Sequence, residues 1–161
     1  MKWVVPVVSL TALALGLFSL AKAPEGHEHE NAATAKTKAL LVKAQKICPV
    51  SGIELGDHGA PIETKSGKQT VFVCCKGCVG KPFDAKHQKT MHANLAAAQG
   101  ICPVMGKALP EDPKSTLVKG RLVFVCCPPC TKKIDADPEK YLKIVDAELS
   151  KKLTKDKKAK E

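Results

Sequence analysis

The chain has 161 residues, a formal net charge of +10 and eight cysteines. This length allows one ordinary domain or two very small ones, and a unit of about fifty residues buries too little apolar surface to be stable without a disulfide, a metal or a packed neighbour. Nucleic-acid binding is disfavoured, because the lysines outside the C-terminal tail are dispersed, aromatic residues make up 4% of the chain and Arg121 is the single arginine.

The N-terminus has the pattern of an export signal. A single lysine at position 2 precedes an apolar run that reaches Leu20, and small residues follow. We therefore predict a signal peptide over residues 1–23, with an uncleaved membrane anchor as the alternative. Either case places the rest of the chain outside the cytoplasm, in the periplasm, the cell envelope or the extracellular space. Residues 24–34 include the polar stretch PEGHEHE and are predicted to be a flexible tether.

The remaining chain contains a duplicated unit. Aligning Cys48 with Cys102 places LVKAQKICPV over LAAAQGICPV, and Gly52 then matches Gly106. In both copies the end of a helix leads into Ile-Cys-Pro-Val, then a short strand, a turn and a second strand. The turns are predicted at residues 66–67 and 119–120, and the second strands at 70–73 and 121–125. We predict repeats over residues 35–98 and 99–153, and a Lys-rich, frayed tail over 154–161.

A helix is predicted after each hairpin. In the second copy Asp137 is a good N-cap and Pro138 suits the first helical position. In the first copy Gly100 can end the helix, which then leads into the second copy. The apolar positions fall on one face of each helix, at Met91, Leu95 and Ala98 in the first and at Tyr141, Leu142, Val145 and Leu149 in the second.

Each second strand runs directly into Cys-Cys-x-x-Cys. A hairpin would bring the distant first cysteine beside this cluster, which is how zinc ribbons and treble clefs gather thiolates from two places in the chain. The predicted fold class is therefore α+β, with two tandem treble-clef or zinc-ribbon-like units, each a β-hairpin followed by a helix and preceded by a helix. The candidate metal ligands are Cys48, Cys74, Cys75 and Cys78 in one copy and Cys102, Cys126, Cys127 and Cys130 in the other.

The adjacent cysteines leave two alternatives for each site. Four sulfurs suit a tetrahedral Zn²⁺ site. However, neighbouring residues of an extended chain point to opposite faces, so Cys74 and Cys75 can bind one ion only if the strand has already broken into a turn. The alternative is a three-thiolate site made by Cys48, one of the adjacent pair and Cys78. Low coordination by sulfur suits Cu(I) and other thiophilic ions.

The run from the strand through FVCC-x-x-C resembles the YHS and TRASH class of small metal-binding domains, associated with heavy-metal trafficking, resistance and sensing. Its typical ending is FCS-x-x-C followed by F-x-x-DP-x-K-Y-L. The second copy is most similar, through residues 137–142, whereas the first copy has KHQKTM there. The class usually begins D-P-V-C-G-M, and this chain carries its cysteine three places earlier, with Ser51 or Met105 at the usual position. The resemblance implies a treble-clef-like fold and binding of a soft or borderline metal.

Two other classes compete with metal binding. An exported protein with an even number of cysteines can carry a disulfide framework, although vicinal cysteines bridge each other only through a strained ring. A thiol oxidoreductase would use the two C-x-x-C spacings, but the βαβ context of a thioredoxin-like fold is missing. All five histidines precede the second copy, and His58, His87 and His92 are expected to be exposed rather than ligating.

We therefore expect an exported protein that is not an enzyme. Its two cysteine clusters would hold Zn, Cu(I) or another heavy metal for trafficking, storage or resistance. The expected partners are the metal ion and a metal transporter or another exported protein, with no nucleic acid. Contact with a membrane is expected only if the N-terminal segment stays uncleaved. A disulfide-stapled or structural-zinc interaction module is the main alternative, and a thiol–disulfide redox protein is the third.

Overall fold

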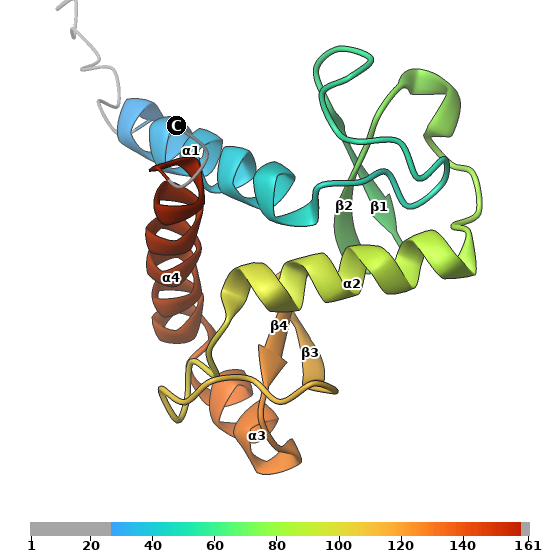
Figure 1. Cartoon of the computed structure of the whole chain (residues 1–161). Helices are drawn as coiled ribbons and strands as arrows, with labels where there is room; N and C mark the ends of the chain where they lie inside the picture. Colours follow the sequence, from blue (N-terminus) through green and yellow to red (C-terminus); the bar gives the residue numbers. More distant parts are fainter. Residues whose placement is uncertain (1–26, 159–161) are drawn as a thin grey trace, which may run out of the picture.

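The computed structural model describes the backbone of residues 27–158 and the side chains of residues 34–156. It has the predicted α+β architecture, with two antiparallel hairpins that are each preceded and followed by helical segments (Figure 1). None of the described helices has the length and apolarity needed to span a bilayer. The predicted signal segment lies outside the described residues. In chain order the elements are α1 (His27–Gln45), β1 (Ile62–Ser66), β2 (Gln69–Val73), η1 (Lys76–Cys78), α2 (Ala85–Gln99), β3 (Lys114–Val118), β4 (Arg121–Val125), α3 (Pro128–Ala136) and α4 (Pro138–Lys158).

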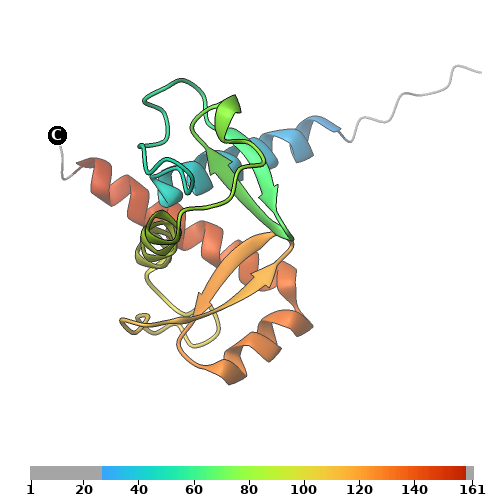
Figure 2. The ribbon, with the colours of Figure 1, turned by 90° about the vertical axis from the view of Figure 1, so that its right-hand side faces the viewer.

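The two hairpins have the same register. In the first, Glu63 lies opposite Phe72, and in the second, Ser115 lies opposite Phe124. The first turn occupies residues 67–68, one position later than predicted. Figure 2 shows the turn ends of the two hairpins meeting, and there the amide of Thr70 donates to the carbonyl of Gly120 over 2.7 Å. The start of β2 therefore contacts the β3–β4 turn directly.

Helix α2 lies between the hairpins and belongs to both units (Figure 1). Asp84 caps its start by accepting a hydrogen bond from the amide of His87 over 3.0 Å. The predicted terminator, Gly100, has φ 71°, a left-handed conformation that glycine adopts without steric cost. Met91, on the face predicted to be apolar, is fully buried.

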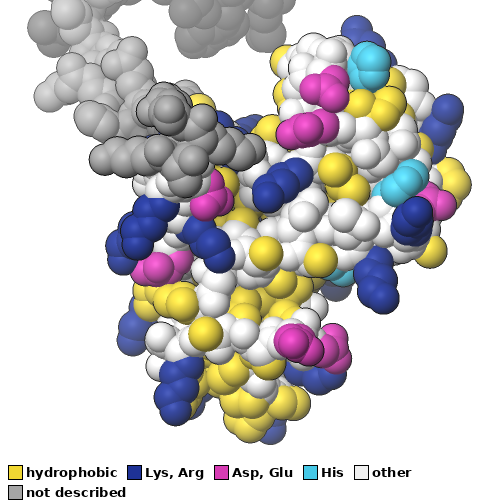
Figure 3. All heavy atoms as spheres, in the orientation of Figure 1, with side chains coloured by type: hydrophobic (Ala, Val, Ile, Leu, Met, Phe, Trp, Pro, Cys, Tyr) yellow, Lys and Arg dark blue, Asp and Glu magenta, His cyan; other side chains and the backbone are white. Residues whose placement is uncertain are grey.

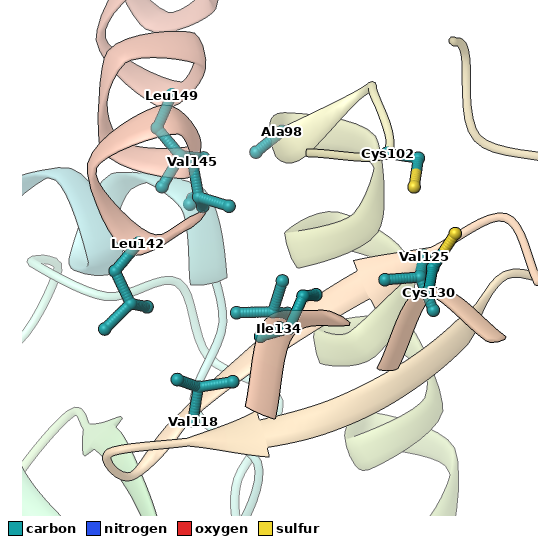
Figure 4. Close-up of a cluster of buried hydrophobic side chains, with 11 residues drawn as sticks. Ala98, Cys102, Val118, Val125, Cys130, Ile134, Leu142, Val145 and Leu149 are labelled. Carbon is teal, nitrogen blue, oxygen red and sulfur yellow. The ribbon is translucent and has the colours of Figure 1, made fainter. Parts of the chain in front are cut away.

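Most of the buried apolar surface belongs to the second unit. Its largest cluster combines β3, β4, α3 and α4 with Ala44 from α1 and Ala98 from α2 (Figure 4). The predicted stripe of α4 packs into it through Leu142, Val145 and Leu149. The corresponding cluster of the first unit has four members, which are Cys48, Val73, Cys74 and Cys78. Three of the four buried residues in this cluster are therefore cysteines.

The prediction of a flexible tether over residues 24–34 is wrong from residue 27 onward, because α1 begins at His27. This stretch has no Pro or Gly after position 26 and contains two alanines, Ala32 and Ala33, which favour helix. The later turns of α1 pack on α2 and α4, so tertiary contacts extend the helix. One of these contacts is the Thr37 hydroxyl donating to Asp146 over 3.4 Å, and Asp146 also forms an ion pair with Arg121.

Candidate metal centre

Three sulfur atoms converge in the first unit. The Sγ atoms of Cys48, Cys74 and Cys78 all lie within 4.8 Å of one another, and the three residues are buried. We call these residues the first trio. The Cys74–Cys78 Sγ separation is 3.8 Å. An ion bonded to sulfur at about 2.3 Å holds its sulfurs about 3.8 to 4 Å apart, so the spacing fits a bound cation.

The loop that carries Cys48 folds back on itself. The Cys48 amide donates to the carbonyl of Ile53 over 2.8 Å, and the Gly52 amide donates to the carbonyl of Cys48 over 2.9 Å. Gly52 has φ 73°, a conformation that most residues adopt only with strain. This tight turn presents the Cys48 side chain to the end of β2, where Cys74 follows the last strand residue.

The second unit repeats this arrangement as a second trio, Cys102, Cys126 and Cys130. The Cys102 amide donates to the carbonyl of Lys107 over 2.8 Å, and Gly106 has φ 66°. Cys126 and Cys130 have a Sγ separation of 3.9 Å. In Figure 4 the sulfur atoms of Cys102 and Cys130 lie at one end of the core cluster, away from the α4 side chains.

A buried glutamine positions each trio. The Gln99 side chain donates to the carbonyl of Phe124 over 2.6 Å and accepts from the amide of Phe124 over 2.9 Å. It also donates to the carbonyl of Ile101 over 2.8 Å. One side chain thus connects the residue before Cys102 with the strand residue two positions before Cys126.

Gln45 makes the same three contacts in the first unit, with Ile47 and with both backbone groups of Phe72. We call Gln45 and Gln99 the glutamine clamps. The duplicated sequence shows a glutamine at this position in both copies. Its role depends on tertiary pairing with a strand edge, which local sequence patterns do not reveal.

The second cysteine of each vicinal pair stays outside the trio. Cys75 is exposed, and its Sγ lies 3.7 Å from that of Cys78. Cys127 is half-buried, and its Sγ lies 3.1 Å from that of Cys130. The three-thiolate alternative therefore describes the grouping of the sulfurs in both units, and the fourth predicted ligand of each copy lies beside one member of the trio.

In the first trio, hydrogen bonds and burial act in opposite directions. Burial raises the pKa of Cys48, but hydrogen bonds from the Ser51 side chain and from backbone amides outweigh burial and lower this pKa to about 6. The Ser51 hydroxyl also lowers the pKa of Cys74, yet burial and the nearby Cys48 sulfur raise it overall. Burial, with hydrogen bonds to Cys75 and Cys74, raises the pKa of Cys78 to about 12. Near neutral pH, the first trio without an ion therefore carries one thiolate, because burial and the repulsion between like charges both disfavour a second.

The second trio has the same pattern. Backbone amides lower the pKa of Cys102 against the opposing effect of burial. The pKa of Cys126 is raised, first by its hydrogen bond with Cys102, and burial is the main cause that raises the pKa of Cys130. A cation would stabilise the thiolate forms and so offset the burial and the repulsion that keep these thiols protonated.

The surroundings of the two trios differ. The Ser51 hydroxyl lies 3.3 Å from the Cys74 sulfur, whereas Met105, at the equivalent position, is 49% exposed. The expectation that His87 and His92 are exposed is wrong, since both are half-buried. A methyl group built on Gly52 would lie 2.5 Å from the His87 ring, so this histidine packs on the Cys48 loop. It is not part of the first trio.

All eight cysteines are free thiols in the structure, so the disulfide framework considered from the sequence is not formed. Comparisons with known proteins add no family: no family model, no curated protein and no solved structure matches the chain. The two cysteine clusters are compatible with binding of a metal ion.

Proposed function

We propose that this chain is an exported metal-binding protein that holds a soft or borderline cation, such as Zn²⁺, Cu(I) or another heavy-metal ion, for trafficking, storage or resistance. The observation that carries the proposal is the repeated convergence of three cysteine sulfurs from two distant stretches of chain. Thiolate ligands select thiophilic ions over Mg²⁺ or Ca²⁺. The resemblance of the FVCC-x-x-C segments to the YHS and TRASH class agrees with this choice, and the N-terminal apolar run supports export.

The surface charge agrees with small-ion cargo better than with nucleic acid. On the face shown in Figure 3, Lys and Arg side chains are interspersed with acidic and uncharged ones and form no continuous basic stripe. The cation is held in buried sulfur clusters, away from these charges. A transporter or another exported protein would receive the ion.

A structural role for the ion is the second candidate, and the first unit favours it. Three of the four buried residues in the core cluster of this unit are the first trio. An ion joining them would supply cohesion that the apolar side chains do not provide. In that case the protein would be a small zinc-dependent scaffold that presents its lysine-rich surface to a partner.

Metal analysis of the full chain purified with a reductant tests the proposal, together with thiol titration of the same sample. We expect two ions per chain and, after chelation, eight reactive thiols. Cys78→Ser should remove the ion of the first unit, and Cys130→Ser that of the second. Val79→Ser, a change at an exposed neighbour of Cys78, is the matched control and should keep both ions. Protein that binds no ion although all its thiols are free would contradict the proposal.

A slow exchange of the bound ion with a chelator would favour the structural role, and fast exchange would favour trafficking. If Cys78→Ser removed both ions together, the two trios would depend on one shared core rather than binding independently.

A further inference from the structure

A further thiol accompanies each trio, exposed at Cys75 and half-buried at Cys127. Cys75 lies beside Cys78, and Cys127 lies beside Cys130, with Sγ separations of 3.7 and 3.1 Å. Cys78 and Cys130 each belong to two groupings, the buried trio and a C-x-x-C pair. A reaction of the pair therefore has a direct effect on the ligands of the trio.

The local backbone brings the members of each pair together. The amide of Cys78 donates to the carbonyl of Cys75 over 3.1 Å, and that of Cys130 donates to the carbonyl of Cys127 over 3.1 Å. Both pairs thus sit on the first turn of η1 or α3, the location at which C-x-x-C thiols are reactive. A disulfide has an S–S bond of about 2.05 Å, so the sulfurs must approach by roughly 1 to 1.7 Å, a distance that side-chain rotation can supply.

Separation selects the second pair, since the Cys127–Cys130 Sγ distance of 3.1 Å is shorter than the 3.8 and 3.9 Å from Cys126 to Cys127 and Cys130. Accessibility selects the first pair. Within the first trio, Cys74 and Cys78 are also close, but both are buried. A reagent from solvent reaches Cys75 first, because its side chain is exposed. Cys75 is therefore suited to attack an incoming disulfide, and Cys78 to resolve the product.

We infer that the Cys75–Cys78 and Cys127–Cys130 pairs undergo thiol–disulfide exchange with a low-molecular-weight disulfide, and that this exchange releases the cation held by the adjoining trio. The inference rests on the proposed function, since it requires a bound ion. It adds a second activity to the same cysteines, namely release of the ion in response to an oxidising thiol pool.

The exchange balances as two steps. The Cys75 thiolate attacks a sulfur of the disulfide RSSR, which forms a mixed disulfide and expels one RS⁻. The Cys78 thiolate then attacks the Cys75 sulfur, which forms the Cys75–Cys78 bond and expels a second RS⁻. The two protein thiolates are oxidised by two electrons in total, and RSSR is reduced to two thiolates.

Loss of Cys78 as a ligand weakens the site whether three or four sulfurs hold the ion. If the trio alone binds it, two sulfurs remain. If Cys75 also binds it, the new disulfide removes two of four ligands. Zn²⁺ is held by four ligands in structural sites, and two thiolates leave its coordination incomplete. Zn²⁺ is therefore the probe of choice.

The test uses the full chain, reduced, loaded with Zn²⁺ and freed of excess metal. Oxidised glutathione is added, zinc release is followed with a chromogenic chelator, and the disulfides formed are mapped by mass spectrometry. We expect release of zinc in step with Cys75–Cys78 and Cys127–Cys130 bonds, and rebinding after reduction. The Cys75→Ser and Cys127→Ser double variant keeps both trios and should release zinc at least about tenfold more slowly, because the attacking thiols are absent.

Three results would overturn the inference. These are zinc that stays bound after the mapped bonds form, release that accompanies a Cys74–Cys78 bond instead, and a double variant that releases zinc as fast as the unchanged protein. Mapping on the unchanged protein decides the question even if the double variant binds no zinc. Failure of the reduced protein to bind zinc at the start would instead count against the proposed function.

Discussion

Replacing Gln99 by leucine should destabilise the second unit through its backbone. Gln99 is 3% exposed and satisfies both the amide and the carbonyl of Phe124. Leucine has a similar volume but no hydrogen-bonding group, so two buried backbone groups lose their partners. An unsatisfied buried group costs about 1–3 kcal/mol, and the added apolar burial offsets about 1 kcal/mol. For two such groups we therefore expect the free energy of unfolding to fall by about 1–5 kcal/mol.

The assay is urea unfolding of the reduced, metal-free protein, which separates this effect from that of the ion. Gln88→Leu is the matched control, because it makes the same change on the same helix. The Gln88 side chain is half-buried and forms no hydrogen bond within the described part of the chain. The reasoning would be refuted if Gln99→Leu lost less than about 0.5 kcal/mol, the range of an ordinary surface change.

The clamp also predicts an effect on the metal. Because Gln99 joins the chain on either side of the second trio, Gln99→Leu should weaken binding at Cys102, Cys126 and Cys130 and leave the first trio nearly unchanged. Gln45→Leu should show the opposite selectivity. Isothermal titration with Zn²⁺ would resolve the two sites, and equal weakening of both sites by either variant would contradict the positioning role.

Three further predictions concern other features. Lys46 has φ 65° where the second copy has Gly100. Lys46→Gly should therefore raise the free energy of unfolding by about 0.5–1 kcal/mol, which urea unfolding detects as a higher midpoint. A lower midpoint would show that the left-handed conformation of Lys46 is not strained. Gly120→Ala should lose about 1–3 kcal/mol, because the new methyl group lies 2.8 Å from the Thr70 hydroxyl. Gly80→Ala is the control, since Gly80 has a similar φ, 76° against 83°, and open space around it, and it should lose clearly less. Equal losses would exclude the steric cause. The pKa of Cys48 is lowered to about 6, whereas those of Cys74 and Cys78 are raised, so binding of an ion near neutral pH should release about two protons. The affinity for the ion should therefore rise with pH until the pH passes the raised pKa values. Titrations in buffers of different ionisation enthalpy measure the number of protons released, and a value near zero would contradict the assigned protonation.

The sequence was sufficient for the features that depend on local patterns. The duplication, both hairpins, the cap at Asp137 and the left-handed terminator Gly100 follow from periodicity and from the preferences of single residues, and the structure confirms them. The convergence of Cys48 with the C-x-x-C segment follows from the hairpin, which reverses the chain. Which cysteines join Cys48 depends on where β2 ends and η1 begins. The sequence did not fix this boundary, and it therefore left both a three-thiolate and a four-thiolate site open.

Two features could not be predicted because they depend on distant contacts. Helix α1 extends back to His27 although the sequence there is polar, since its later turns pack on α2 and α4. The glutamine clamps need the edge of β2 or β4 beside the end of a helix, an arrangement that exists only in the folded chain. The contact between the His87 ring and Gly52 also joins residues far apart in the sequence, so it too could not be predicted.

The sharing of α2 has a consequence for how the duplicated gene can be divided. The helix closes one copy and supplies Ala98 and Gln99 to the next, while α1 of the first copy contributes Ala44 to the core of the second. No single cut therefore yields two self-sufficient halves. The copies have become mutually dependent, and deletion or transplantation of either one removes part of the scaffold on which the other is built.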